Sequence, residues 1–240
     1  MKKILLMAFL LVSAASVWAQ TTTVTDNNAR VREVGNFSGV KVSAGIELLL
    51  QQGDKDAVAV SCSHPEYLER IKTSVEGNVL KISIDNMSGG DWKWRKNVKF
   101  KAYVSIRQLE KLYASSGSIV KTGAVIQVQT LDLDASSGAI VEAEFKGQSI
   151  TVDNSSGAIV TLKGTVESLD VEASSGAIFK GFDLSSVNCS ADASSGGTIS
   201  ITVTKELNAE ASSGGEIKYK GGGVIRKLHT GSGGSVRSNG

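Results

Sequence analysis

Ala135-Ser136-Ser137-Gly138-Ala139-Ile140 is the stretch that decides the fold, because copies of it recur along the second half of the chain at intervals of 18 to 21 residues. Such an interval is too short for helix-pair repeats or propeller blades, and it fits one coil of a β-solenoid or one leucine-rich repeat. The leucine-rich signature is absent, so the interval favours the solenoid. The triplet glycines are Gly117, Gly138, Gly157, Gly176, Gly196, Gly214 and Gly233.

The residues that lead into each triplet alternate between apolar and polar side chains. Leu131, Leu133 and Ala135 alternate with Asp132 and Asp134, and residues 169–173 and 207–211 repeat the pattern. A period of two indicates a strand with one buried face. Each coil should therefore contain this strand, a second one after the triplet and a less sharply patterned third, stacked in parallel about 4.8 Å from the next coil.

The triplet itself has the composition of a sharp corner. Glycine adopts the positive φ that such a corner requires, and serine hydroxyls can bond the local backbone or one another along the stack. A small residue usually precedes the triplet, which predicts a solenoid that is narrow at this point. A second glycine predicts another corner in several coils, at Gly123, Gly147, Gly164, Gly181 and Gly221.

Residues 24–113 are less regular but still favour strands. Ser43-Ala44-Gly45-Ile46 resembles a worn copy of the corner, and residues 72–84 have the pattern of a hairpin. Ser63-His64-Pro65-Glu66 predicts one short helix, about Pro65 to Ile71, with Ser63 as its cap. Because no linker separates the two parts, we expect one domain over 20–240, with irregular N-terminal rungs or a cap before the regular coils of 114–240.

The N-terminus has the plan of a secretory signal peptide. Lys2 and Lys3 precede an apolar run from Ile4 to Val12, and cleavage is expected after Ala19. The run is too short to cross a bilayer, and no second run of spanning length follows. Of 26 Lys and Arg residues, two leave with residues 1–19, so 24 cations face 24 Asp and Glu residues. A neutral exported chain gives no electrostatic reason to expect nucleic acid as a partner.

The sequence offers no constellation for catalysis, metal binding or a cofactor. The chain has two histidines, His64 and His229, and the serines recur in every coil, unlike a unique nucleophile. Cys62 and Cys189 each lie in an alternating apolar row, which predicts two buried thiols. Several rungs separate them, more than the roughly 7 Å between Cα atoms that a disulfide allows.

One local feature lies outside the repeat pattern. Trp92, Trp94 and Arg95 follow Gly89-Gly90 and should occupy a loop or hairpin tip. Tryptophans beside cations in a loop predict contact with a glycan or a partner protein. The alternative is that the two rings pack on the flank of the solenoid while the cations face water.

The chain resembles the exported bacterial family described as "putative auto-transporter adhesin, head GIN domain" from about Phe37 onwards. The resemblance implies a right-handed parallel β-helix, export across the inner membrane and no catalysis. The segments that carry it, besides the tandem triplets, are Phe37-Ser38-Gly39-Val40-Lys41-Val42, Gly45-Ile46-Glu47-Leu48, Gly77-Asn78-Val79-Leu80-Lys81-Ile82 and Leu109-Glu110-Lys111-Leu112.

We therefore expect a non-catalytic protein of the cell envelope, periplasmic or at the cell surface, that is structural or binds in the manner of an adhesin. Envelope polysaccharide or another protein is the expected partner, because long flat solenoid faces suit extended ligands. One alternative is a self-assembling scaffold, a homo-oligomer joined through solenoid ends. The other is a carbohydrate-active enzyme, which requires acidic residues that converge in a cleft. We expect a plain outer ladder of Asp132, Asp134, Asp153, Asp170 and Glu172.

Overall fold

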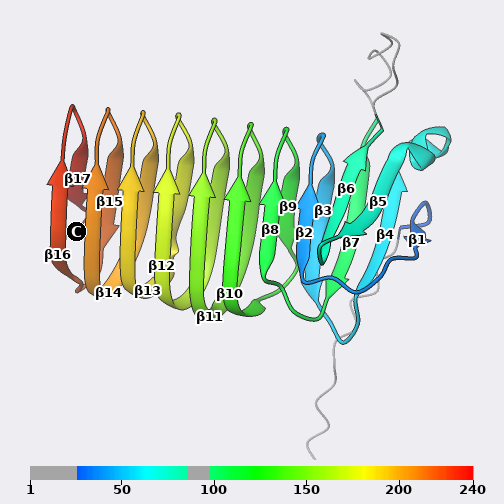
Figure 1. Cartoon of the computed structure of the whole chain (residues 1–240), viewed down its shortest axis with the longest axis horizontal. Coiled ribbons are helices and arrows are strands. Elements are labelled where there is room, and N and C mark those ends of the chain that lie inside the picture. The colour runs from blue at the N-terminus through cyan, green and yellow to red at the C-terminus, as the bar shows by residue number, and fades with distance from the viewer. Residues whose placement is uncertain (1–25, 86–97, 240) are drawn as a thin grey trace, which may run out of the picture.

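A computed structural model describes residues 26–85 and 98–239. These residues form a flattened β-solenoid of two facing sheets, so the predicted all-β fold of parallel stacked coils is confirmed (Figure 1). In Figure 1 the near strands run upwards and the far strands run downwards, and the chain advances from right to left. The solenoid is therefore right-handed. The predicted signal peptide, residues 1–19, and the loop with Trp92, Trp94 and Arg95 lie outside the described residues.

The regular coils contain two strand limbs each, one in either sheet, and the third strand per coil is not formed. We call the near sheet in Figure 1 the front sheet and the far one the back sheet. In β11, the limb 140–147 belongs to the back sheet and the limb 149–154 to the front sheet. The long strands are β10 (Ile126–Ala135), β11 (Ile140–Asn154), β12 (Ile159–Ala173), β13 (Ile178–Ala193) and β14 (Thr198–Ala211). β15 (Glu216–Lys220) follows in the back sheet, and β16 (Val224–Thr230) and β17 (Ser235–Ser238) form the last coil.

Each Ser-Ser-Gly triplet forms a tight turn in which two residues are left-handed. Ser137 has φ 52° and Gly138 has φ 72°, and the N–H of Ala139 donates to the carbonyl of Ser136 at 3.1 Å. The N–H of Gly138 donates to the carbonyl of Ser156 in the next coil at 3.1 Å. The turns are thus joined by main-chain hydrogen bonds, and none of the described triplets shows the hydroxyl ladder that the sequence suggested.

The interior is narrow beside these turns, as the small residues predicted. The position before each of the first six triplets is fully buried, at Ala114, Ala135, Asn154, Ala173, Ala193 and Ala211, whereas Thr230 before the seventh is exposed. Gly197 lies across from this row, and a Cβ on it would stand 2.1 Å from the carbonyl oxygen of Ala173. Gly197 occupies the position that Ala177 occupies one coil earlier. Two residues further on, Ile199 pairs with buried Phe179.

A second corner is also present, as a bend inside each long strand (Figure 1), but the predicted glycines do not mark it in every coil, because Gly147 lies opposite Val166 whereas Gly164 lies opposite Phe145. Its length varies, because the pairing of β12 with β13 and of β13 with β14 shifts register there. Residues 181–185 hold the extra residues of β13 at this corner.

The N-terminal coil is inserted into the stack out of chain order. β2 pairs in parallel with both β6 and β8, and β3 pairs in parallel with both β7 and β9. The worn corner is confirmed as a turn of this coil, with Ala44 at φ 64° and Gly45 at φ 75°. The six strands are β2 (Gly39–Val42), β3 (Glu47–Gln52), β6 (Val79–Ile84), β7 (Phe100–Ile106), β8 (Lys111–Ala114) and β9 (Ile119–Thr122).

Antiparallel strands cover the N-terminal end of the stack. β4 (Ala57–Cys62) pairs with β7, β1 (Arg30–Arg32) pairs with β4, and β5 (Ile71–Glu76) forms the expected hairpin with β6. The short helix is a 3₁₀ helix, η1 (Pro65–Arg70). Ser63 is not its cap, because the Ser63 hydroxyl accepts a hydrogen bond from the N–H of Lys99 at 2.9 Å.

The two cysteines are free and buried, as expected. Cys62 lies in the N-terminal cap on β4, whereas Cys189 lies in the front limb of β13. Burial raises the pKa of the Cys189 thiol to about 12.

Candidate functional site: the outer face of the front sheet

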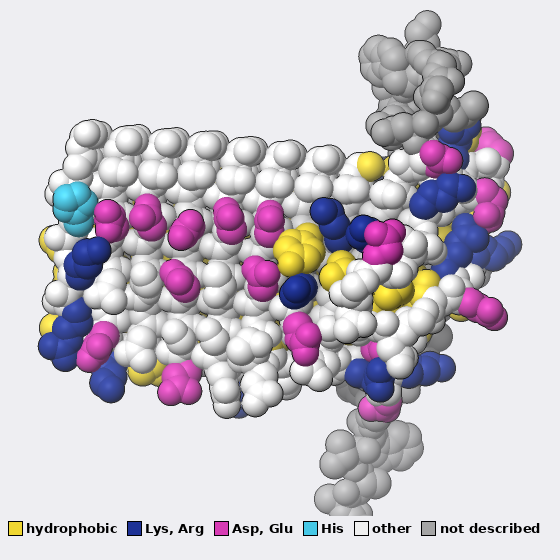
Figure 2. Space-filling view, in the orientation of Figure 1, with side chains coloured by type: hydrophobic (Ala, Val, Ile, Leu, Met, Phe, Trp, Pro, Cys, Tyr) yellow, Lys and Arg dark blue, Asp and Glu magenta, His cyan; other side chains and the backbone are white. Residues whose placement is uncertain are grey.

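Five carboxylates form one row across the outer face of the front sheet. Parallel in-register pairing places each of them beside its equivalent in the next coil, at the strand spacing of about 4.8 Å. Figure 2 shows this row of acidic side chains crossing the near face. We call it the acidic ladder, and it consists of Asp134, Asp153, Glu172, Asp192 and Glu210.

The acidic ladder is bounded by other side chains in the same register. Towards the N-terminal cap it continues through Tyr113 to Lys41 and Lys81, and at the other end it reaches His229. The ammonium of Lys41 lies 6.0 Å from the centre of the Tyr113 ring. The row therefore passes from cationic and aromatic groups into five consecutive acids.

A second outer row runs beside the ladder and is more mixed in charge. It contains Asp132, Asp170 and Lys227, separated by uncharged residues. The hydroxyl of Tyr113 donates to Asp132 at 3.3 Å, and Lys227 forms an ion pair with Glu210 at 3.2 Å. The ladder is thus neutralised at its C-terminal end by a neighbouring row.

Burial and neighbouring carboxylates raise the pKa of two members of the ladder. Burial, followed by the charges of Asp153 and Asp132, raises the pKa of Asp134 above its usual value. Burial and the charge of Glu210 raise the pKa of Asp192, while Lys227 partly offsets this effect. In both cases burial is the larger cause, and a neighbouring carboxylate adds to it because a like charge disfavours ionisation.

The expected arrangement as a plain ladder is confirmed, because the acids stack along the sheet instead of converging. Asp134, Asp153 and Glu172 occupy one row, whereas Asp132 and Asp170 occupy the next. No group of three or more His, Cys, Asp or Glu residues is placed to hold a metal ion within ranges 26–85 and 98–239. The arrangement suits contact with an extended partner more than acid–base chemistry on a small substrate.

An apolar hollow of about 440 Å³ lies on the other side of the molecule, on the outer face of the back sheet near the cap. Val31, Leu49, Ala57 and Ala59 are among the residues that line it. The hydroxyl of Tyr103 donates to Asp26 at 2.7 Å, which ties the start of the described chain over this face. Burial and the adjacent Asp26 raise the pKa of Tyr103 to about 12.

The sequence identified part of this surface and missed the rest. It singled out Asp132, Asp134, Asp153, Asp170 and Glu172, which the structure places in two adjacent rows. Lys41 and Tyr113 were missed as neighbours of the ladder, because no local pattern shows that β2 pairs with β8.

The fold and its outer rows define a β-solenoid protein whose front sheet carries a repeating row of charged side chains. A family model described as "Putative auto-transporter adhesin, head GIN domain" matches residues 36–223, and the chain belongs to this family. The resemblance inferred from the sequence is thereby confirmed. No curated protein matches this sequence.

Solved structures share the fold at low sequence identity. A "putative adhesin" from Bacteroides fragilis superposes with a TM-score of 0.75 at 19% identity, covering 88% of this chain and 95% of that one. A "putative lipid binding protein" from Parabacteroides distasonis gives 0.65 at 20%, covering 90% and 98%. A "putative adhesin" from Parabacteroides merdae gives 0.65 at 17%, covering 88% and 95%. Within the described residues, no helix is long and apolar enough to span a membrane.

Proposed function

We propose that this protein is a non-catalytic, exported binding module of the cell envelope that holds an extended partner along the outer face of its front sheet. The observation that carries the proposal is the acidic ladder, five carboxylates in register on a flat surface. A partner that repeats along its own length, such as a polysaccharide or an extended protein segment, matches a surface that repeats at each coil. Family membership supports an adhesin-like role.

The charge of the ladder sets the chemistry of this partner. Asp153 and Glu172 lie at its centre, beside carboxylates on both sides. Burial and neighbouring carboxylates raise the pKa of Asp134 and Asp192, and a partner that brings amino groups would offset the repulsive part of this effect. We therefore expect amino-sugar polymers or lysine-rich segments to bind more tightly than neutral or acidic glycans.

The test compares binding of the purified protein to an isolated envelope fraction, a glycan array and polylysine. The double variant Asp153→Asn/Glu172→Gln should weaken polylysine binding by about tenfold, which corresponds to ~1.4 kcal/mol. Added salt should weaken binding by the wild type more than by this variant. Glu142→Gln/Glu144→Gln, on the back sheet, is the matched control and should bind as the wild type does. Equal binding by both double variants would reject the ladder as the contact surface.

Trp92, Trp94 and Arg95 are a second proposed contact, argued from the sequence alone. In the same glycan array, Trp92→Ala/Trp94→Ala should reduce binding to neutral glycans, because ring stacking on sugars does not depend on partner charge. If the double variant binds every glycan as the wild type does, the rings have a packing role instead.

The hollow on the back sheet favours a second candidate function, the binding of an acyl chain or another small apolar ligand. Its apolar lining and the hydrogen-bonded pair of Tyr103 and Asp26 fit the general character of small-molecule sites. A fluorescent fatty acid should bind the wild type, and Leu49→Asp should abolish binding because it places a charge in the hollow. Unchanged binding by Leu49→Asp would exclude the hollow as the site.

A further inference from the structure

The last coil of the solenoid leaves the hydrophobic interior open to solvent. Leu228 in β16 occupies the inward position that Ala209 occupies in β14, yet it is 55% exposed where Ala209 is 1% exposed. Val236 in β17 continues the row of fully buried Ile217 but is only partly buried. Ile225 in β16, which pairs with Leu207 in β14, is also partly buried. These side chains have the pattern of core residues that lack the next layer.

The same end also presents two unpaired strand edges. β16 pairs with β14, and β17 pairs with β15, and no other described strand lies on their outer sides. The opposite end of the stack is different, because β1, β4, β5 and η1 cover it. An uncovered edge of a sheet is a template for pairing with another chain.

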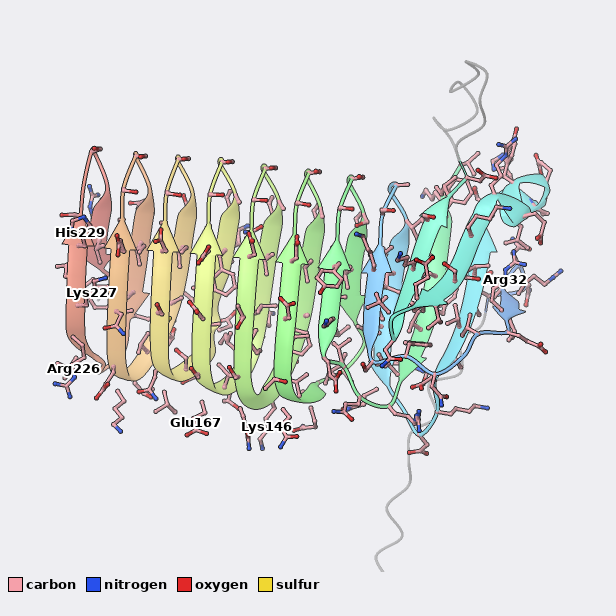
Figure 3. The ribbon with its side chains drawn as sticks, in the orientation of Figure 1. Arg32, Lys146, Glu167, Arg226, Lys227 and His229 are labelled. Atoms are coloured by element: carbon pink, nitrogen blue, oxygen red, sulfur yellow. The ribbon has the colours of Figure 1, made fainter. Side chains whose placement is uncertain are left out.

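Basic side chains near a strand edge commonly prevent such pairing, but the two in β16 form ion pairs with their own molecule. Arg226 forms an ion pair with Glu206 at 3.0 Å, and Lys227 forms one with Glu210 at 3.2 Å. Figure 3 shows Arg226, Lys227 and His229 on this last coil, at the left end of the stack. Because both cations are neutralised by the preceding coil, two such ends can approach with little net repulsion from these groups.

We propose that two copies of this chain dock through their C-terminal coils across a two-fold axis. A two-fold axis perpendicular to the solenoid axis reverses the direction of a facing strand, so the edges of β16 and β17 would pair antiparallel with the partner's edges. Ile225, Leu228 and Val236 would meet their symmetry equivalents and continue the interior across the contact. The same surface serves both copies, so the assembly closes at two chains and does not grow into a filament.

The area of this end of the solenoid sets the expected affinity of the dimer. A seven-residue strand is about 23 Å long, and two sheets about 10 Å apart with their outer side chains are about 20 Å thick, so each copy buries about 500 Å². The total of about 1,000 Å² is at the lower limit of specific interfaces, which predicts a weak dimer with a micromolar Kd. The dimer leaves the outer face of the front sheet free, so it is independent of the proposed binding function.

Light scattering coupled to size-exclusion chromatography tests this proposal from about 1 to about 500 µM protein. The wild type should convert from monomer to dimer over this range, and Leu228→Glu should weaken the dimer by at least about tenfold because it buries a charge in the contact. Val125→Glu, which alters another exposed apolar residue away from the last coil, is the matched control and should dimerise as the wild type does. A wild type that stays monomeric, or a mass that grows beyond two chains, would overturn the proposal.

A measurement on the wild type keeps the test valid if Leu228→Glu fails to fold. Amide hydrogen exchange in β16 and β17 should slow as the protein concentration rises, while exchange in β1 and β5 at the other end should stay constant. Concentration-dependent protection at the capped end alone, or persistence of the dimer in folded Leu228→Glu, would contradict the C-terminal contact.

Discussion

The N–H of Gly45 donates a hydrogen bond to the carbonyl of Ser116 at 3.0 Å, although the two residues lie far apart in the sequence. This bond places the turn of the first coil directly against the turn that opens the regular repeats. The same bond then recurs from Gly117 to Ser137 and onwards through the stack. One ladder of main-chain hydrogen bonds thus joins the irregular and regular parts of the solenoid into a single structure.

Substitution of a charged residue at the narrow inner row should unfold the protein. Ala173 is fully buried beside the turn, and Ala173→Asp would place an unpaired carboxylate where no water reaches it, at a cost of more than about 4 kcal/mol. Ser174→Ala, one residue further on at a partly exposed position, should change stability by less than about 0.5 kcal/mol. Chemical denaturation monitored by circular dichroism measures both, and equal small effects would defeat the assignment of inner and outer faces.

Replacement of Asn154 by alanine should stabilise the protein. Asn154 occupies the buried row that alanine fills in the neighbouring coils, and its amide nitrogen and oxygen have no hydrogen-bond partner. Asn154→Ala should raise the free energy of unfolding by about 1–3 kcal/mol, because a buried unpaired amide is costly. Ala135→Asn, the converse change one coil away, should lower it by a similar amount. A loss of stability in Asn154→Ala would show that the amide is satisfied in solution.

The acidic ladder should make the protein less stable as the pH rises. The pKa of Asp134 and of Asp192 in the folded protein is raised above the ordinary 3.8. Between pH 3.8 and the folded pKa, the native state therefore binds more protons than the unfolded state. Stability from these groups is therefore present below that window and lost as the pH rises through the folded pKa. Asp134→Asn should gain stability over the wild type as the pH rises from about 3 to about 7.

Thermal denaturation across this pH range measures the effect, and Glu144→Gln on the back sheet serves as the control. The gap between wild type and Asp134→Asn should widen with pH and shrink in high salt. A constant gap at every pH would mean that the substitution acts through packing and not through charge.

Both thiols should resist alkylation in the folded protein. Cys62 and Cys189 are buried, and burial raises the pKa of Cys189 to about 12, so very little thiolate forms at neutral pH. Iodoacetamide followed by mass spectrometry should show no modification of Cys189 until denaturant is added. Fast labelling of native Cys189 would contradict its place in the core, and Cys62 offers a second site for comparison.

The sequence predicted those features that depend on local repetition. The alternation of Leu131, Asp132 and Leu133 established which side chains face inwards, and the triplet spacing established parallel coils. Stacking then places Asp134 beside Asp153, because identical positions in successive coils lie in register. The ladder was predictable for the same reason, since it is an outward position of the repeat.

The remaining features depend on pairing between distant segments, for which the sequence has no local signal. Insertion of β2 between β6 and β8 keeps the inward residues of all three strands in one core, but nothing near Val40 specifies its neighbours. The sequence likewise has no local sign that Gly197 occupies the position of Ala177, where the carbonyl of Ala173 leaves no room for a side chain, so that Ile199 pairs with Phe179. Ser63 met the rule for a helix cap but bonds Lys99 instead, a partner from a distant segment.

The central claim, that the triplets join stacked coils along one axis, is tested most directly by spin-label distances along one outer row. Pairing places Lys111, Asp132, Thr151, Asp170, Ser190, Asn208 and Lys227 in this row. Labels at Lys111 and Ser190, four coils apart, should lie about 19 Å from each other, and labels at Lys111 and Lys227, six coils apart, about 29 Å. Separations that do not grow with the number of intervening coils would contradict the stack.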